Sequence, residues 1–234
     1  MVSRGALALG AICAAEPLAA CRLALVLALD VSSSVDPVED RLQRSGLAAA
    51  LIAPEVEVAA LAGPGPVALY VFEWSGRYNQ KRLFDWRLIE SPSDLLAAAE
   101  AVAGSTRSTS DFPTALGHAL GHASTVLRRA PDCTQRTIDI SGDGKNNEGF
   151  GPAEAYAAFP LQEVTVNALV LNAGEFEAET DLIDWFAAEV IRGPGAFIEV
   201  AQGFDDFERA MTRKLVRELG VQVLGGEIAA GRGG

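Results

Sequence analysis

The chain has 234 residues, of which 49% are hydrophobic and 21% are charged, so it is long enough to bury a sizeable core. Its 31 acidic and 19 basic residues give a formal net charge of -12. An acidic surface repels phosphate backbones, which argues against a nucleic-acid partner.

The first twenty residues predict an export signal. Arg4 gives a positive start, residues 5–15 form a short apolar run, and small residues precede Cys21. This run is too short to span a bilayer and no other stretch is apolar enough, so we expect no transmembrane segment. We therefore expect residues 1–20 to be a signal peptide of an exported protein, either periplasmic or secreted. Residues 18–21 (LAAC) also fit a lipoprotein box, so lipidation of Cys21 remains an alternative.

Strand and helix patterns alternate along the rest of the chain. The predicted strands cover residues 22–29, 67–74, 81–89, 136–140, 164–171 and 196–200, and the predicted helices cover residues 36–52, 91–102, 112–129, 153–159, 180–191 and 204–219. This order predicts an α/β fold: a Rossmann-like, doubly wound, mostly parallel six-stranded sheet with one antiparallel edge strand and helices on both faces. The glycine-rich end, residues 223–234, is predicted to be a disordered tail.

Oxygen-bearing side chains follow the predicted strands at the edge where such sheets bind ligands. Asp30, Ser32 and Ser34 come after the first strand, Asp143 comes after the fourth, and Ser110 precedes the central helix. Alternate residues of an extended turn point the same way, so the first three can converge on one ion. Carboxylates and hydroxyls without a nearby Cys or His suit Mg²⁺ or Mn²⁺, with Ca²⁺ as a weaker candidate.

These residues resemble the metal-ion-dependent adhesion site (MIDAS) of von Willebrand factor type A (vWA) domains. The D-x-S-x-S sequence at residues 30–34 matches the first motif of that family, and Asp143 matches the aspartate after its fourth strand. Ser110 takes the place of the threonine in a T-x-x-x-x-A-[LI] stretch, with Thr109 as the alternative if the register shifts by one. The stretches VLALDVSSSVD, VALYVFEWSG, TIDISGDGKNN and GPGAF are similar to one bacterial subgroup whose function is not defined.

The resemblance implies a binding module rather than an enzyme, formed by a vWA domain over residues 21–222. In that family the hydroxyls usually bind the metal directly and the aspartates often act through water, which leaves one position open for a partner. The chain is thus expected to be a monomer that uses Mg²⁺ or Mn²⁺ to bind a Glu or Asp carboxylate of a protein partner. Lys145 and Asn146 are expected to shape the loop over the ion or to contact the partner.

The alternative function is a metal-dependent hydrolase of the phosphohydrolase type that uses the same site. Asp30 would then act as nucleophile or metal ligand. This hypothesis lacks a general base near the site, and the sequence carries no nucleophile elbow or phosphate-binding glycine loop.

The positions of two cysteines predict a disulfide. Cys21 lies nine residues before Asp30, and Cys133 lies ten residues before Asp143. If both aspartates end neighbouring parallel strands, both cysteines begin them and lie within bridging range. Removal of the signal peptide takes the third cysteine away and leaves this pair in an oxidising compartment.

One carboxylate falls inside a strand that should be buried. Asp139 alternates in phase with the predicted site residue Asp143. A buried carboxylate needs a partner. We expect a structural network around it, whose other members the sequence does not name.

Overall fold

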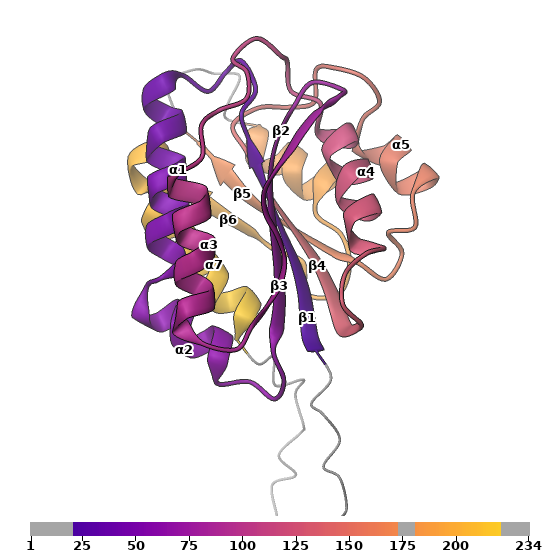
Figure 1. The fold of residues 1–234 in the computed structure, drawn as a ribbon. Helices are drawn as coiled ribbons and strands as arrows, with labels where there is room; N and C mark the ends of the chain where they lie inside the picture. The colour runs from indigo at the N-terminus through magenta and orange to yellow at the C-terminus, as the bar shows by residue number, and fades with distance from the viewer. Residues whose placement is uncertain (1–20, 173–180, 221–234) are drawn as a thin grey trace, which may run out of the picture.

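A six-stranded sheet forms the centre of the computed structural model, which describes residues 21–172 and 181–220 (Figure 1). The strands are β1 (Cys21–Asp30), β2 (Val67–Ser75), β3 (Asn79–Ile89), β4 (Cys133–Gly142), β5 (Thr165–Leu171) and β6 (Ile198–Ala201), in the order β3-β2-β1-β4-β5-β6. Every neighbouring pair is parallel except β2 and β3. The predicted fold class is therefore confirmed.

Helices cover both faces of this sheet (Figure 1). On one face lie α1 (Pro37–Leu51), α2 (Pro54–Leu61), α3 (Pro92–Ala103) and α7 (Phe207–Leu219), which follows a 3-10 turn at Phe204–Asp206. On the other face lie α4 (Leu116–Leu127), α5 (Pro152–Ala158), α6 (Leu182–Trp185) and a π-helical turn at Phe186–Val190. No helix in these two described ranges has the length and apolar character needed to cross a membrane.

The central strand β1 is apolar throughout because both of its faces are buried. Leu25 and Leu27 pack into the core beneath α1 and α7, whereas Val26 and Ala28 pack into the core beneath α4. This burial fixes the register of β1, and Asp30, its last residue, lies at the carboxyl end of the strand.

Two helix predictions differ from the structure in ways that bear on the site. The first predicted helix ends at Leu51, and a separate helix α2 follows from Pro54, whose ring suits the first position of a helix. The helix predicted over residues 112–129 begins only at Leu116. The segment before it is a loop because the backbone of Thr114 bonds to a neighbouring loop instead of to its own helix.

The predicted disulfide is confirmed. Cys21 and Cys133 are directly paired first residues of β1 and β4, and their sulfurs are bonded. A Cys21 sulfur in this bond is not available for a lipid, so the disulfide and the lipoprotein alternative exclude each other. The predicted signal peptide at residues 1–20 and the predicted tail at residues 223–234 lie outside the described residues.

The buried carboxylate of Asp139 forms an ion pair with Lys214 on the last helix, α7. The Lys214 ammonium is fully buried and lies 2.8 Å from Asp139 and 2.6 Å from Glu218. Asn167 on β5 donates a hydrogen bond to Glu218 at 2.7 Å. This network joins β4, β5 and α7, as expected for a structural rather than a catalytic group.

We expect the Asp139→Asn variant to lose part of the pH dependence of stability. Burial, followed by repulsion from Glu218, raises the pKa of Asp139 from 3.8 to about 8, although Lys214 opposes the rise. Between these two values the folded state holds a proton that the unfolded state has released, so stability falls as pH rises. One such proton corresponds to a slope of about 1.4 kcal/mol per pH unit.

Urea unfolding of both proteins between pH 5 and 8 measures this slope. The free energy of unfolding should fall less steeply with pH in Asp139→Asn than in the wild type. Parallel curves would show that Asp139 is ionised in the folded protein at pH 5.

Candidate metal site

The candidate site lies at the point where the strand order of the sheet reverses. From β1 the chain proceeds outward to β2 and β3, whereas β4, β5 and β6 extend in the opposite direction. In α/β sheets this switch point, beyond the carboxyl ends of the strands, is where ligands bind. Asp30 ends β1, and Asp143 directly follows β4, the neighbouring strand.

Hydroxyl groups connect the two sides of this edge in an unbroken chain. The Thr114 hydroxyl donates to the Ser32 hydroxyl at 3.2 Å, which lies 3.1 Å from the Ser34 hydroxyl. Ser34 in turn donates to Asp143 Oδ1 at 2.7 Å. Asp30 joins through Oδ1, which accepts the Ser32 backbone N–H at 2.7 Å. Four of the five predicted metal ligands therefore come together, with Thr114 beside them.

Ser110 does not join this chain. Its side chain is exposed and its hydroxyl donates to Asp111 at 3.0 Å, whereas Thr114 is 3% exposed and touches Ser32. The alternative residue, Thr109, accepts the Asp111 backbone N–H at 3.3 Å. The helix starts four residues later than the T-x-x-x-x-A-[LI] placement assumed.

The sequence contains a signal that would have selected Thr114. The same spacing recurs from Thr114 to Ala119 and Leu120, and this second match has a true threonine at its head. The pair Ala115-Leu116 sits four residues earlier and produced the placement on Ser110. Ala and Leu are both strong helix formers, so an Ala-Leu pair is weak evidence for a register. The threonine at the head of the second match and the position of the helix start distinguish the two registers.

Arg107 holds the loop that carries the serines, a role that the sequence did not indicate. Its guanidinium donates to the backbone carbonyls of Val31 at 2.9 Å, Ser32 at 2.6 Å and Val35 at 2.6 Å. On the opposite side, Gln43 of α1 donates to the Asp30 carbonyl at 2.7 Å. The loop after β1 is thus fixed by charged and amide donors from outside it.

A second loop holds Thr114 through its backbone. Asn147 Oδ1 accepts the Thr114 N–H at 2.9 Å, and the Asn147 N–H donates to the Thr114 carbonyl at 2.9 Å. Next to it, Asn146 accepts the Gly117 N–H at 3.2 Å at the start of α4. Lys145 forms an ion pair with Asp181 at 2.5 Å. Asn146 therefore holds the start of α4, next to Thr114, whereas Lys145 is paired with Asp181.

The pKa of Asp30 is raised by its burial and by the neighbouring carboxyl group of Asp143. Asp30 is 1% exposed, and burial raises the pKa of its carboxyl well above the usual range. The nearby charge of Asp143 raises this pKa further, whereas the hydrogen bonds from Ser32 and the charge of Arg107 oppose the rise. A positive charge between the two carboxyl groups would relieve both the desolvation and the repulsion.

The residues present fit a hard divalent cation. Within the described part of the chain, Asp30 Oδ2 is buried without a hydrogen-bond partner, on the same carboxyl group whose Oδ1 accepts the Ser32 N–H. A Cβ at Gly142 would lie 3.5 Å from this oxygen, an ordinary contact, and 3.1 Å from Phe186 Cζ, so Gly142 packs directly against Asp30 and Phe186. Residues 21–172 and 181–220 contain no group of three His, Cys, Asp or Glu suited to a metal. A cation at this edge would therefore be held by hydroxyl oxygens as well as carboxylates, a donor set that suits Mg²⁺ or Mn²⁺.

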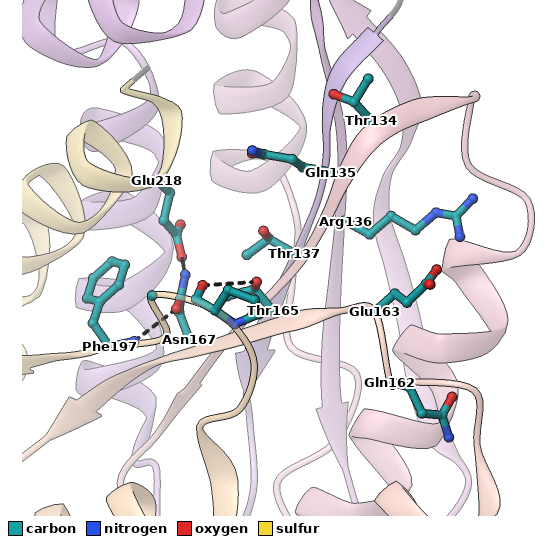
Figure 2. A pocket seen from close by; sticks show the side chains of 12 residues that line it. Thr134, Gln135, Arg136, Thr137, Gln162, Glu163, Thr165, Asn167, Phe197 and Glu218 are labelled. Atoms are coloured by element: carbon teal, nitrogen blue, oxygen red, sulfur yellow. Dashed lines mark hydrogen bonds between the residues drawn. The ribbon is translucent and has the colours of Figure 1, made fainter. Parts of the chain in front are cut away.

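A hollow of about 460 Å³ lies at the opposite edge of the sheet, away from these residues. Figure 2 shows the side chains that line it. Its walls come from the starts of β4 and β5, the segment before β6, and α7. Its lining includes three threonines and two glutamines, and its buried carboxylate, Glu218, already pairs with Lys214. None of the predicted site residues lines it.

The chain matches a known protein family. A family model described as a protein of unknown function, DUF1194, matches residues 20–223. The sequence matches no curated protein.

Similar solved structures share the fold at low sequence identity. The proximal thread matrix protein 1 of the mussel byssus, with a zinc-occupied MIDAS motif, has a TM-score of 0.58 and 18% identity over 86% of this chain and 48% of its own. A von Willebrand factor type A protein from Catenulispora acidiphila has a TM-score of 0.54 and 16% identity over 86% of this chain and 43% of its own. The pilus adhesin SpaC from Lactobacillus rhamnosus GG has a TM-score of 0.59 and 14% identity over 85% of this chain and 30% of its own. This chain therefore spans about half the length of these proteins or less.

Proposed function

Because this chain belongs to the DUF1194 family and has the vWA fold, we propose that it is an exported binding module whose MIDAS binds an acidic group of a protein partner. The observation that carries the proposal is the hydroxyl chain from Thr114 to Asp143 beside the unpartnered oxygen of Asp30. Hydroxyls outnumber carboxylates in this set, so a bound cation keeps much of its positive charge.

The residues proposed to hold the cation, preferably Mg²⁺ or Mn²⁺, come from three segments. They are Asp30, Ser32, Ser34, Thr114 and Asp143, with Thr114 taking the place first given to Ser110. When bound, the cation supplies an electrophilic position that a carboxylate oxygen of the partner can occupy. The chain itself orients that position, because Arg107 and Asn147 fix the two loops that carry the hydroxyls.

Similar proteins support the binding character of the proposal. One is a thread matrix protein with a metal in this motif, and another is a pilus adhesin. Adhesion by a bound cation requires no general base, in agreement with a site composed of hydroxyls and two carboxylates.

The disulfide supports the proposal that the protein is exported. Structural disulfides persist in oxidising compartments and are rare in the cytosol. The Cys21–Cys133 bond is buried at both ends. A periplasmic or secreted location, reached through a signal peptide at residues 1–20, agrees with this. Intact mass and the N-terminal sequence of the protein recovered from its native host test the export step.

The proposed ligand set predicts opposite behaviour for two neighbouring hydroxyls. Thr114→Val keeps the shape of a buried side chain but removes its oxygen, so we expect Mg²⁺ affinity to fall by about 10- to 100-fold. Ser110→Ala removes an exposed hydroxyl that bonds only locally, so affinity should stay within about twofold of the wild type. Isothermal titration with MgCl₂ and MnCl₂ measures both.

Thr114→Ser is the matched control, because it restores the hydroxyl in a smaller side chain and should recover most of the affinity. Circular dichroism confirms that each variant is folded. Loss of affinity in Ser110→Ala together with full affinity in Thr114→Val would return the role to Ser110.

A further inference from the structure

A second hollow of about 350 Å³ lies at the same edge of the sheet as the candidate metal site. It is bordered by the turn between β2 and β3 and by two loops, and we refer to it as the aromatic hollow. Its lining residues are Gly76, Arg77, Tyr78, Phe112 and Glu148.

Two aromatic side chains of this hollow face solvent. Tyr78 is 91% exposed and Phe112 is 46% exposed. Aromatic rings contribute a large apolar contact area with little loss of side-chain entropy, and they are enriched at protein interfaces. Two such rings around one concavity form a surface suited to an apolar group.

The walls of the aromatic hollow are held in place before any partner arrives. The Gly76 N–H donates to the Pro113 carbonyl at 2.7 Å, and Gly76 has a φ of +54°, which favours glycine. A Cβ at this position would lie 2.9 Å from Phe112 Cβ, so the turn packs directly against that residue. Arg77 and Glu148 form an ion pair at 2.8 Å and neutralise each other. The backbone around Gly76 and Phe112 is therefore held in place, and the two charged residues of the hollow are paired with each other.

The aromatic hollow is physically connected to the metal site. The Phe112 carbonyl accepts the Ser33 N–H at 2.8 Å, and Phe112 lies two residues before Thr114 on the same loop. The spacing between hollow and site is thus fixed by backbone hydrogen bonds. An extended partner segment advances about 3.3 Å per residue, so a side chain one to three positions from the bound acid can reach such a neighbouring hollow.

We propose that the aromatic hollow receives an apolar side chain from the same partner segment that presents its carboxylate to the cation. This inference rests on the proposed function, and it specifies the partner: a protein segment with an Asp or Glu and, within three residues, a Leu, Met or aromatic side chain. The acid supplies the metal-dependent part of the affinity, and the apolar side chain supplies selectivity among acidic segments.

A peptide array tests this proposal. Each peptide carries one Asp in a Gly/Ser background, and one Phe or Leu is moved through the three positions on either side of it. The full chain is applied in MgCl₂ or in EDTA. We expect binding in MgCl₂ only, and an increase of about five- to tenfold for peptides with the apolar residue at one or two defined positions.

Two exposed substitutions provide the matched comparison. Tyr78→Ser and Phe112→Ser should remove the positional preference while leaving the metal-dependent binding of the Asp-Gly/Ser peptides unchanged. Val58→Ser removes a 65% exposed apolar side chain from α2, away from this edge, and should change neither.

Each other outcome has a distinct meaning. Metal-dependent binding of acidic peptides without a positional preference would overturn this inference and leave the proposed function intact. The absence of any metal-dependent binding would overturn both. A wild-type dimer on size-exclusion chromatography that Tyr78→Ser dissociates would assign the hollow to a second copy of the chain instead.

Discussion

Asp30→Asn is expected to remove most of the stabilisation by Mg²⁺ without destabilising the metal-free protein. The wild-type carboxylate is buried beside Asp143, and its Oδ2 has no hydrogen-bond partner among the described residues, so its charge costs free energy until a cation binds. The amide removes that charge but keeps an oxygen that can accept the Ser32 N–H. Affinity for Mg²⁺ should fall by about 100-fold, the upper end of the effect of groups that orient a metal.

Thermal unfolding with and without MgCl₂ measures this effect directly. At 100 times its Kd the cation should stabilise the wild type by about 2.7 kcal/mol, or about 5–10 °C in Tm for a chain of this size. At the same MgCl₂ concentration, a 100-fold weaker affinity leaves Asp30→Asn with about 0.4 kcal/mol of stabilisation, a shift of about 1 °C. Without metal, this variant should unfold at or above the wild-type Tm. Asp111→Asn, an exposed carboxylate on the same edge, is the matched control and should respond like the wild type. A normal Mg²⁺ shift in Asp30→Asn would remove Asp30 from the site.

Removal of the disulfide should have the largest effect on stability. Cys21 and Cys133 close a loop with a sequence separation of 112 residues. Loop-closure entropy predicts that a double substitution to Ala lowers the free energy of unfolding by about 4–5 kcal/mol. The corresponding decrease in Tm is about 10–20 °C.

Guanidinium unfolding with and without a reductant separates this effect from lost packing. Reduction should destabilise the wild type nearly to the level of the double variant. The reductant should not change the stability of the double variant itself. The bridge joins the first residues of β1 and β4, whereas the metal site lies beyond their last residues, so Mg²⁺ affinity of the folded variant should stay within about twofold of the wild type. An equally stable reduced wild type would contradict the loop-closure account.

Features that repeat a local pattern were predictable from the sequence. The apolar run of β1 announces a strand buried on both faces, and the matched distances from the cysteines to Asp30 and Asp143 follow from two parallel strands in register. The side chains of the D-x-S-x-S turn lie together as predicted, because the motif is short and directly follows that strand. These inferences need only residues close together in the chain or aligned by one pair of strands.

Features that depend on distant contacts were not predictable in the same way. The start of α4 is set by Asn147, which binds the backbone of Thr114 from a loop more than thirty residues later. Arg107 reaches back about seventy residues to the loop after β1, and Lys214 meets Asp139 across a similar interval. No periodicity or spacing encodes such pairs. From the sequence we therefore predicted Ser110, whereas the hydroxyl that contacts Ser32 is that of Thr114, four residues later, where the sequence holds a second match to the motif.

A crystal grown with MnCl₂ and measured for anomalous scattering tests the central claim most directly. We expect one strong anomalous peak at the carboxyl edge of β1 and β4, surrounded by oxygens of Ser32, Ser34 and Thr114, with the carboxylates of Asp30 and Asp143 bound directly or through water. One coordination position should hold water or a carboxylate from a neighbouring molecule. A peak elsewhere in the fold, or none at Mn²⁺ concentrations that saturate the protein in solution, would contradict it.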